Sequence, residues 1–156
     1  MASSSLALAR SVHEVAFTAL VAWLRADQPL ARAVRTWRVW DGDKGSDVLP
    51  ASAAQLPWVR LTPEPGPIEP FTFGSLGRSW RVPLVVAIEA AVPGSDVADS
   101  MRLWGAIFDR LLAWDHGASG VSDLLPTAAA ESVNDSDFTV ARGSALLVMF
   151  VSVPNP

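Results

Sequence analysis

The clearest hydrophobic pattern in the chain runs from Ser79 to Asp115, where an alternating segment is followed by a segment with helical spacing. Every second residue of the first segment is apolar, which is typical of a strand with one face on a core. That face carries Trp80, Val82, Leu84, Val86 and Ile88, and the other carries Arg81, Pro83, Val85, Ala87 and Glu89. Pro93 and Gly94 cannot continue a ladder, and Ser95 or Asp96 can cap a helix, so the strand is expected to turn into a helix.

The segment after this turn repeats apolar residues at steps of three and four, which predicts a helix with one apolar stripe. The stripe consists of Val97, Met101, Trp104, Phe108 and Leu111, widened by Ile107, Leu112 and Trp114. The opposite side is charged, with Asp99, Arg102, Asp109 and Arg110, and the helix is expected to end near Asp115. Such a helix needs a sheet to cover, so this strand and this helix form the nucleus of the predicted fold.

A second helix is predicted at the N-terminal end of the chain. Ser3 to Ser5 can cap it, and Gln28 and Pro29 stop it near Asp27. Its main stripe is Leu6, Ala9, His13, Ala16, Phe17, Leu20, Trp23 and Leu24, and a second apolar set is Leu8, Val12, Val15, Ala19 and Ala22. A helix that is apolar nearly all round is buried on two sides, either by the core or by a neighbouring subunit.

Three short strands and two loops are expected between these helices. Aromatic and β-branched residues predict strands at 33–40, 58–62 and 71–73, with a loop at 41–57. Four prolines between Pro63 and Pro70 predict a second loop that is extended and stiff. Gly74 to Gly77 has the composition of a hairpin turn that leads into the strand from Ser79, so a projecting hairpin is expected there.

The C-terminal part of the chain predicts a last hairpin. Residues 117–126 are expected to be irregular, 128–133 to form a strand, and 134–137 to turn into a long strand from Phe138 to Val153, with a bulge at Arg142 and Gly143. Strands that follow each other through turns pair antiparallel. The predicted fold class is therefore α+β, with a single mostly antiparallel β-sheet, two main α-helices packed on it and a projecting loop and hairpin, in one domain over residues 1–156.

Composition narrows the class of partner. The net charge of −4, with a single lysine, argues against a surface that binds phosphates. Cysteine is absent, which excludes disulfides, thiol nucleophiles and the usual zinc sites. The first residues lack the pattern of a signal peptide, and no apolar run is long enough for a membrane span. The seven tryptophans exceed what a small core needs, so they are candidates for contacts between chains.

No motif in the sequence carries catalytic chemistry. Residues 41–47 begin like a calcium loop, but the glycine is one position early and Ser52 stands where a bidentate Glu is required. The glycines at 74–77 lack the lysine and the spacing of a phosphate loop. His13 and His116 lie on an apolar helix face and at a helix end, where histidines usually serve structure. The sequence therefore predicts a protein that is not an enzyme and that holds no cofactor or metal.

The order of these elements resembles that of the tail-terminator, or tail-completion, proteins of long-tailed bacteriophages. Most of the likeness lies in the stretch WRVPLVVAIEAAVPGSDVADSMRLWGAIFDRLL, and it extends to the N-terminal helix, the strands with tryptophan, the proline-rich hairpin and the last hairpin. The resemblance implies a structural protein of the virion that is assembled in the host cytoplasm. It implies a homo-oligomer, a hexameric ring at the head–tail junction that caps the tail-tube protein, stops its polymerisation and contacts a head-completion or neck protein.

Two sets of residues are candidates for this assembly. The proline-rich loop with Pro65 and Pro67, and the hairpin with Phe71, Phe73, Arg78 and Trp80, are expected to touch the tube or a neighbouring subunit, unless the phenylalanines fold back onto the core. Asp41, Asp43 and Asp47 are expected to face the lumen of the ring, where acidic groups keep DNA from binding as it passes.

Two other functions stay open at this stage. A neck adaptor or stopper ring shares the size and the symmetry of a terminator, and a soluble domain whose tryptophans line a pocket fits the same composition.

Overall fold

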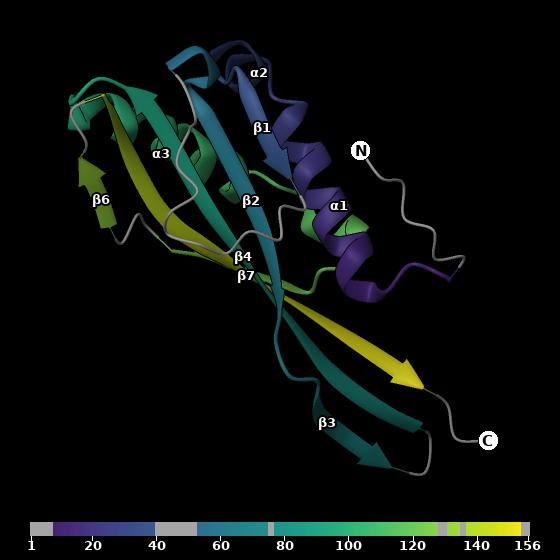
Figure 1. Cartoon of the computed structure of the whole chain (residues 1–156). Helices are drawn as coiled ribbons and strands as arrows, with labels where there is room; N and C mark the ends of the chain where they lie inside the picture. Colours follow the sequence, from purple (N-terminus) through teal and green to yellow (C-terminus); the bar gives the residue numbers. More distant parts are fainter. Residues whose placement is uncertain (1–7, 40–52, 75–76, 128–130, 135–136, 154–156) are drawn as a thin grey trace.

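In a computed structural model, the structure describes residues 8–39, 53–74, 77–127, 131–134 and 137–153. The helices are α1 (Val12–Arg25), α2 (Gln28–Ala33) and α3 (Val97–Leu112), with short 3-10 helices η1 (Ala53–Gln55) and η2 (His116–Ser119). The strands are β1 (Thr36–Val39), β2 (Trp58–Pro65), β3 (Glu69–Gly74), β4 (Gly77–Pro93), β5 (Asp123–Pro126), β6 (Glu131–Asn134) and β7 (Phe138–Val153). Figure 1 shows the strands in one twisted sheet with the helices beside its upper part.

The predicted α+β class with one mostly antiparallel sheet is confirmed. The seven strands follow the order β1-β2-β4-β7-β5, while β3 pairs with β4 and β6 pairs with β7. Only β1 and β2 pair in parallel, with Trp37 opposite Val59. The long connection between these two strands gives the chain enough length to return to the same end of the sheet, which a parallel pair requires.

The centre of the sheet is the long antiparallel pair of β4 and β7, whose register is unbroken from Pro93 and Phe138 to Arg78 and Val153. The expected alternation along β4 is confirmed, because Val82, Leu84, Val86 and Ile88 are buried. They pack in one core with residues of both α1 and α3, so both main helices cover the same face of the sheet. We call this the helix-side face, and the opposite one the far face.

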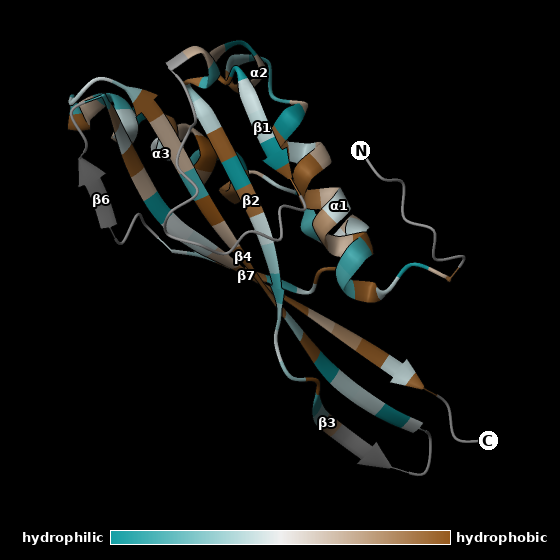
Figure 2. Ribbon diagram, in the orientation of Figure 1, coloured by the Kyte–Doolittle hydropathy of each residue, from teal (hydrophilic) through white to brown (hydrophobic). Residues whose placement is uncertain are grey.

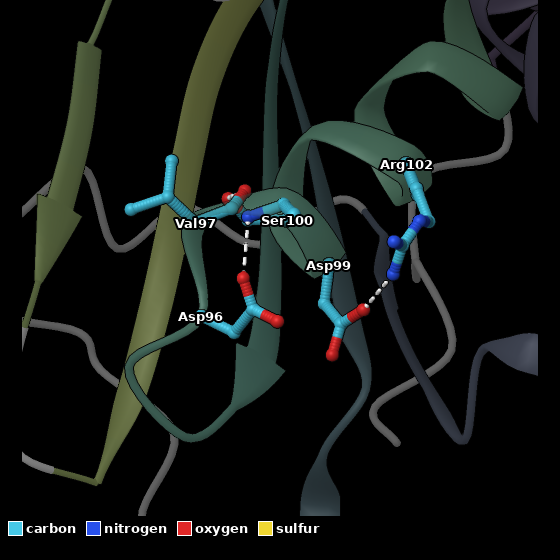
Figure 3. A network of polar contacts seen from close by, with 6 residues as sticks. Asp96, Val97, Asp99, Ser100 and Arg102 are labelled. Atoms are coloured by element: carbon cyan, nitrogen blue, oxygen red, sulfur yellow. Dashed lines mark hydrogen bonds and ion pairs between the residues drawn. The ribbon is translucent and has the colours of Figure 1, made fainter.

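Helix α3 begins where the sequence predicts. The carboxylate of Asp96 accepts a hydrogen bond from the backbone N–H of Ala98 at 2.9 Å, and the Arg102 guanidinium pairs with Asp99 at 2.5 Å on the exposed side (Figure 3). The predicted stripe is partly wrong. Trp104, Ile107, Leu111 and Trp114 are buried, but Val97, Met101 and Leu112 are exposed, and the buried face also includes Ser100 and Leu103.

Helix α1 starts later than the sequence suggests. Its N-cap is Ser11, whose hydroxyl accepts the N–H of Glu14 at 3.1 Å, and Leu8 to Arg10 are not helical. Residues 1–7 lie outside the described part of the chain. Pro29 does not only end this helix: it lies in the first turn of α2, which Asp27 caps.

The proline-rich segment is mostly strand, which corrects the predicted loop. Strand β2 continues to Pro65, opposite Leu84, and β3 begins at Glu69. Because β1 pairs with β2 only as far as Leu61, β2 is an edge strand beyond that point, where prolines cost no ladder bond. Gly66 is needed in the short connection, since a Cβ there would lie 2.8 Å from Cγ of Pro83.

The C-terminal region also departs from expectation at two points. The segment predicted to be irregular contains η2 and β5, and β5 pairs with β7 from Asp123 to Pro126. No bulge occurs at Arg142 and Gly143, which stay in register with Glu89 and Ile88. The long strand from Phe138 to Val153 and its pairing with a preceding short strand, β6, are confirmed.

Candidate interaction surface

The sheet extends well beyond the helices that cover it. At about 3.3 Å per residue, a strand as long as β4 spans roughly 55 Å. At 1.5 Å per residue, a helix as long as α3 covers only about 24 Å. The uncovered part is a three-stranded ribbon, which we call the arm: β3, residues Gly77–Arg81 of β4 and residues Phe150–Val153 of β7. It projects away from the helices in Figure 1, so the projecting hairpin expected from the sequence is present.

The far face of the arm carries a pair of exposed aromatic rings. The centroids of Phe71 and Phe150 are 4.7 Å apart with an interplanar angle of 56°, and the two side chains are 60% and 40% exposed. Beside them, Arg81 pairs with Glu69 at 3.3 Å. Since the rings contact each other but stay in solvent, they do not fold back onto the core of the subunit.

The helix-side face of the arm is also apolar. At the root of the arm, Trp80, Val82 and Val151 line a groove of about 420 Å³ together with Val12 and Ile68. His13 and Ser11 complete its wall, and Nε2 of His13 lies 3.2 Å from the carbonyl oxygen of Pro83. A ribbon that is apolar on both faces is typical of sheet that is covered on both sides, yet this subunit covers neither completely.

The structure brings the residues proposed from the sequence to one region. Pro65 ends β2, Pro67 lies exposed between β2 and β3, and Phe71 is exposed on β3. The backbone of Phe73 pairs with exposed Arg78, while the Phe73 side chain lies outside the described residues. Trp80 lines the groove. Their role in assembly stays a prediction.

The sequence analysis missed the contribution of β7 to the arm. Phe150 and Val153 are exposed apolar residues, and Val151 lines the groove. The lengths of the elements contain a signal for this contribution. A strand rises about 3.3 Å per residue and a helix about 1.5 Å, so two paired strands with about as many residues as the longest helix must extend beyond the helical layer.

The tryptophans that the structure describes do not gather around the groove at the root of the arm. Trp58, Trp104 and Trp114 are buried in the part of the subunit outside the arm, which we call the body. Trp23 joins the two main helices. Its indole N–H donates to the backbone carbonyl of Arg110 at 2.7 Å, and the guanidinium carbon of Arg110 lies 3.5 Å from the centroid of its ring. Trp80 alone, among the described tryptophans, lines the groove at the root of the arm. The excess of tryptophan therefore serves packing more than it serves a surface.

Two further apolar patches lie on the helices. On α3 the exposed residues Val97, Met101 and Leu112 follow the helical period, and on α1 Val12 and Val15 are exposed. The second apolar face of α1 is thus not covered by the core. Figure 2 shows apolar residues along α1 and along the end of β7.

The far face of the body is polar at its centre. Register places Arg38, Arg60, Glu89 and Arg142 in one row across β1, β2, β4 and β7. Arg60 is only 3% exposed and pairs with Glu89 at 2.7 Å, and its guanidinium carbon lies 5.6 Å from the centroid of the Trp58 ring. This buried ion pair fixes the sheet and is not open to a ligand. The acidic residues predicted for a lumen, Asp41, Asp43 and Asp47, lie outside the described residues.

Within the part of the chain that the structure describes, no group of three or more acidic or histidine side chains is arranged to hold a metal ion. Among the same residues, no helix has both the length and the apolar character that a membrane crossing needs.

Comparison with protein-family models gives no match, and comparison with curated proteins gives none either. Among solved structures, the chain is similar to one from a structure titled "Virion of native gene transfer agent (GTA) particle". The two share 16% identical residues over 86% of this chain and 93% of that chain, with a TM-score of 0.46. A likeness of this size carries no argument about function.

Proposed function

We propose that this protein is a structural subunit of a phage-like virion, and that it acts as a tail terminator, a ring that caps the tail tube. The arm is the observation that carries the proposal. A ribbon with Phe71 and Phe150 exposed on one face and Trp80 and Val151 on the other has no covering layer among the residues that the structure describes. A covering layer from other chains would bury these side chains.

A ring also needs contacts on more than one side of each subunit. A heterologous interface joins two different surfaces of neighbouring copies and closes when the rotation between them does. The arm, with the adjoining exposed residues Val12 and Val15 of α1, and the exposed side of α3 are two separate apolar surfaces. One surface can bind a neighbouring copy while another binds the tube or a neck protein. Growth of the tube would then stop because the ring occupies the end to which further tube subunits add.

The proposal includes a virion location at the head–tail junction and passage of DNA through the lumen, with Asp41, Asp43 and Asp47 facing it. The protein is not an enzyme in this scheme. A neck adaptor would use the same surfaces against a different partner. The third alternative, a pocket lined by tryptophans, finds less support, because only Trp80 of the described tryptophans lines the groove.

The test is electron microscopy of tail-tube subunits polymerised with and without this protein. Tubes of restricted length with a ring at one end are expected for the native chain. A double variant, Phe71→Ser with Phe150→Ser, should fold but leave tubes long and uncapped, because it removes the exposed rings of the arm.

A matched control is Met101→Ser with Leu112→Ser, which removes two apolar side chains of α3 that are at least as exposed as Phe71 and Phe150. Capping by the arm variant and not by this control would move the tube-binding surface to α3. Bare, unlimited tubes with the native chain would overturn the terminator and favour a neck adaptor.

A further inference from the structure

The arm has two outer edges, one along β3 and one along the end of β7, and their backbones differ in what they offer to another strand. Strand β5 pairs with β7 only from Ala145 to Val148, and β6 pairs with it only from Thr139 to Arg142. Among the described residues, no strand pairs with the outer edge of β7 beyond this point. Within the described part of the chain, the outer edge of β7 in the arm is therefore open.

The side of β7 to which each backbone N–H and C=O points follows from the hydrogen bonds that the strand makes. The carbonyl of Val148 accepts the N–H of Ser122 at 2.8 Å, and the carbonyl of Ser144 accepts the N–H of Thr127 at 2.8 Å, so these residues face the outer edge. Because groups alternate along a strand and the register with β4 is unbroken, the N–H and C=O of Phe150 and Ser152 also face outward. This edge offers two donors and two acceptors.

The edge of β3 is protected. The same alternation makes Val151 face Trp80, so Ser79 and Arg81 face β3, and Pro70 faces outward. Proline has no N–H to donate, and the register shift at Phe71 interrupts the strand. Proline and bulges are devices that prevent pairing at an edge, whereas the end of β7 contains neither.

We propose that a second copy of this chain pairs with the open edge of β7, antiparallel, about a two-fold axis at Val151. In this register Phe150 lies opposite Ser152 of the second copy, and both residues of each such pair face outward. The two pairs exchange four backbone hydrogen bonds, which is every group that the edge offers.

A second copy fits this edge because the edge complements itself. The two copies of Val151 meet side by side on the helix-side face, next to the groove, and thereby extend an apolar surface. Arg81, which lies opposite Phe150, is already paired with Glu69 within the subunit. The two arms then form a six-stranded ribbon, in which the open edges of β7 are paired and the protected edges of β3 lie at the outside.

This contact is independent of the proposed ring, because an isologous pair closes on two copies by itself. It involves the five residues Met149–Val153 of each strand and is smaller than a standard interface, so we expect a weak dimer that forms at micromolar concentration.

The test uses the absence of cysteine from the native chain. In a Val151→Cys variant the two thiols would face each other across a non-hydrogen-bonded pair with Cα atoms about 4.5 Å apart, a distance that a disulfide spans. Mild oxidation of the dilute protein should therefore give a covalent dimer. In the matched Val153→Cys variant the two thiols would be separated by four residues, or about 13 Å, and should not bridge.

A second variant tests the hydrogen bonds. Ser152→Pro removes an outward N–H and leaves the ladder with β4 intact, so the fold should persist and dimerisation, measured by analytical ultracentrifugation, should weaken at least about tenfold. Equal bridging by both cysteine variants would overturn the proposal, since it would show random collision. A monomer at all concentrations would overturn it too, as would an assembly that Phe73→Pro, on the β3 edge, abolishes and Ser152→Pro does not.

Discussion

The body and the arm of this protein are built on the same pair of strands, β4 and β7, but they differ in how their apolar side chains are covered. In the body, α1 and α3 lie on β4 and β7, and Leu84, Ile88 and Leu147 are fully buried. In the arm the alternation continues, but the rings of Phe71 and Phe150 contact each other and remain exposed. The difference shows that apolar patterning by itself specifies a buried face but not which chain buries it.

The largest expected difference between the two halves is in stability. Replacing Leu84 by Ala in the body removes a fully buried side chain and leaves a cavity, so we expect the free energy of unfolding to fall by about 2–5 kcal/mol. Urea denaturation followed by circular dichroism measures it. A loss below about 1 kcal/mol would mean that the centre of the sheet is not the core of the fold.

A smaller effect is expected where β4 turns into α3. Asp96→Ala removes the hydrogen bond to the N–H of Ala98 (Figure 3), and loss of such a cap costs about 1 kcal/mol. Asp99→Ala is the control, because it breaks an exposed ion pair in the same turn, which is worth only about 0.3–0.5 kcal/mol. Equal destabilisation by both variants would argue that charge at the helix start matters more than the cap.

The smallest effect on the isolated subunit is expected in the arm. Val153→Ser changes an apolar side chain that is 50% exposed, so the free energy of unfolding should stay within about 0.5 kcal/mol of the native value. Thermal unfolding at a concentration where the protein is monomeric measures it. A loss comparable to that of Leu84→Ala would show that the arm belongs to the core of the subunit, and the contrast between the two halves would disappear.

The sequence predicts well where one physical signal acts alone. The alternation along β4 identifies a strand and its buried face, the segment from Phe138 to Val153 is recognisable as a long strand, and Asp96 identifies the start of α3. The buried face of α3 was misjudged because the helix carries apolar residues on two sides: Val97, Met101 and Leu112 are as apolar as the buried set but face solvent. The buried Ser100 was missed because a small polar residue at a close helix–sheet contact looks like an exposed position.

The candidate site was predicted in part for a related reason. Phe71 and Trp80 are recognisable as aromatic residues near prolines, whereas nothing in the local sequence around Phe150 and Val153 predicts that they are exposed. Their exposure depends on where the helices stop, which is a property of the assembled layers and not of β7 itself. The hairpin was visible in local turn residues, but its third strand comes from the far end of the chain.

The pairing of β4 with β7 also bears on the order of folding. The two strands are separated in the sequence by α3, and their closest partners along the chain are Pro93 and Phe138, while Arg78 and Val153 are the most distant. Contacts between remote segments form slowly, because the chain must lose entropy before it gains packing. We therefore expect the ladder to close first beside α3 and last at the tip of the arm, so that the surface suited to other chains is completed only when the body is already folded.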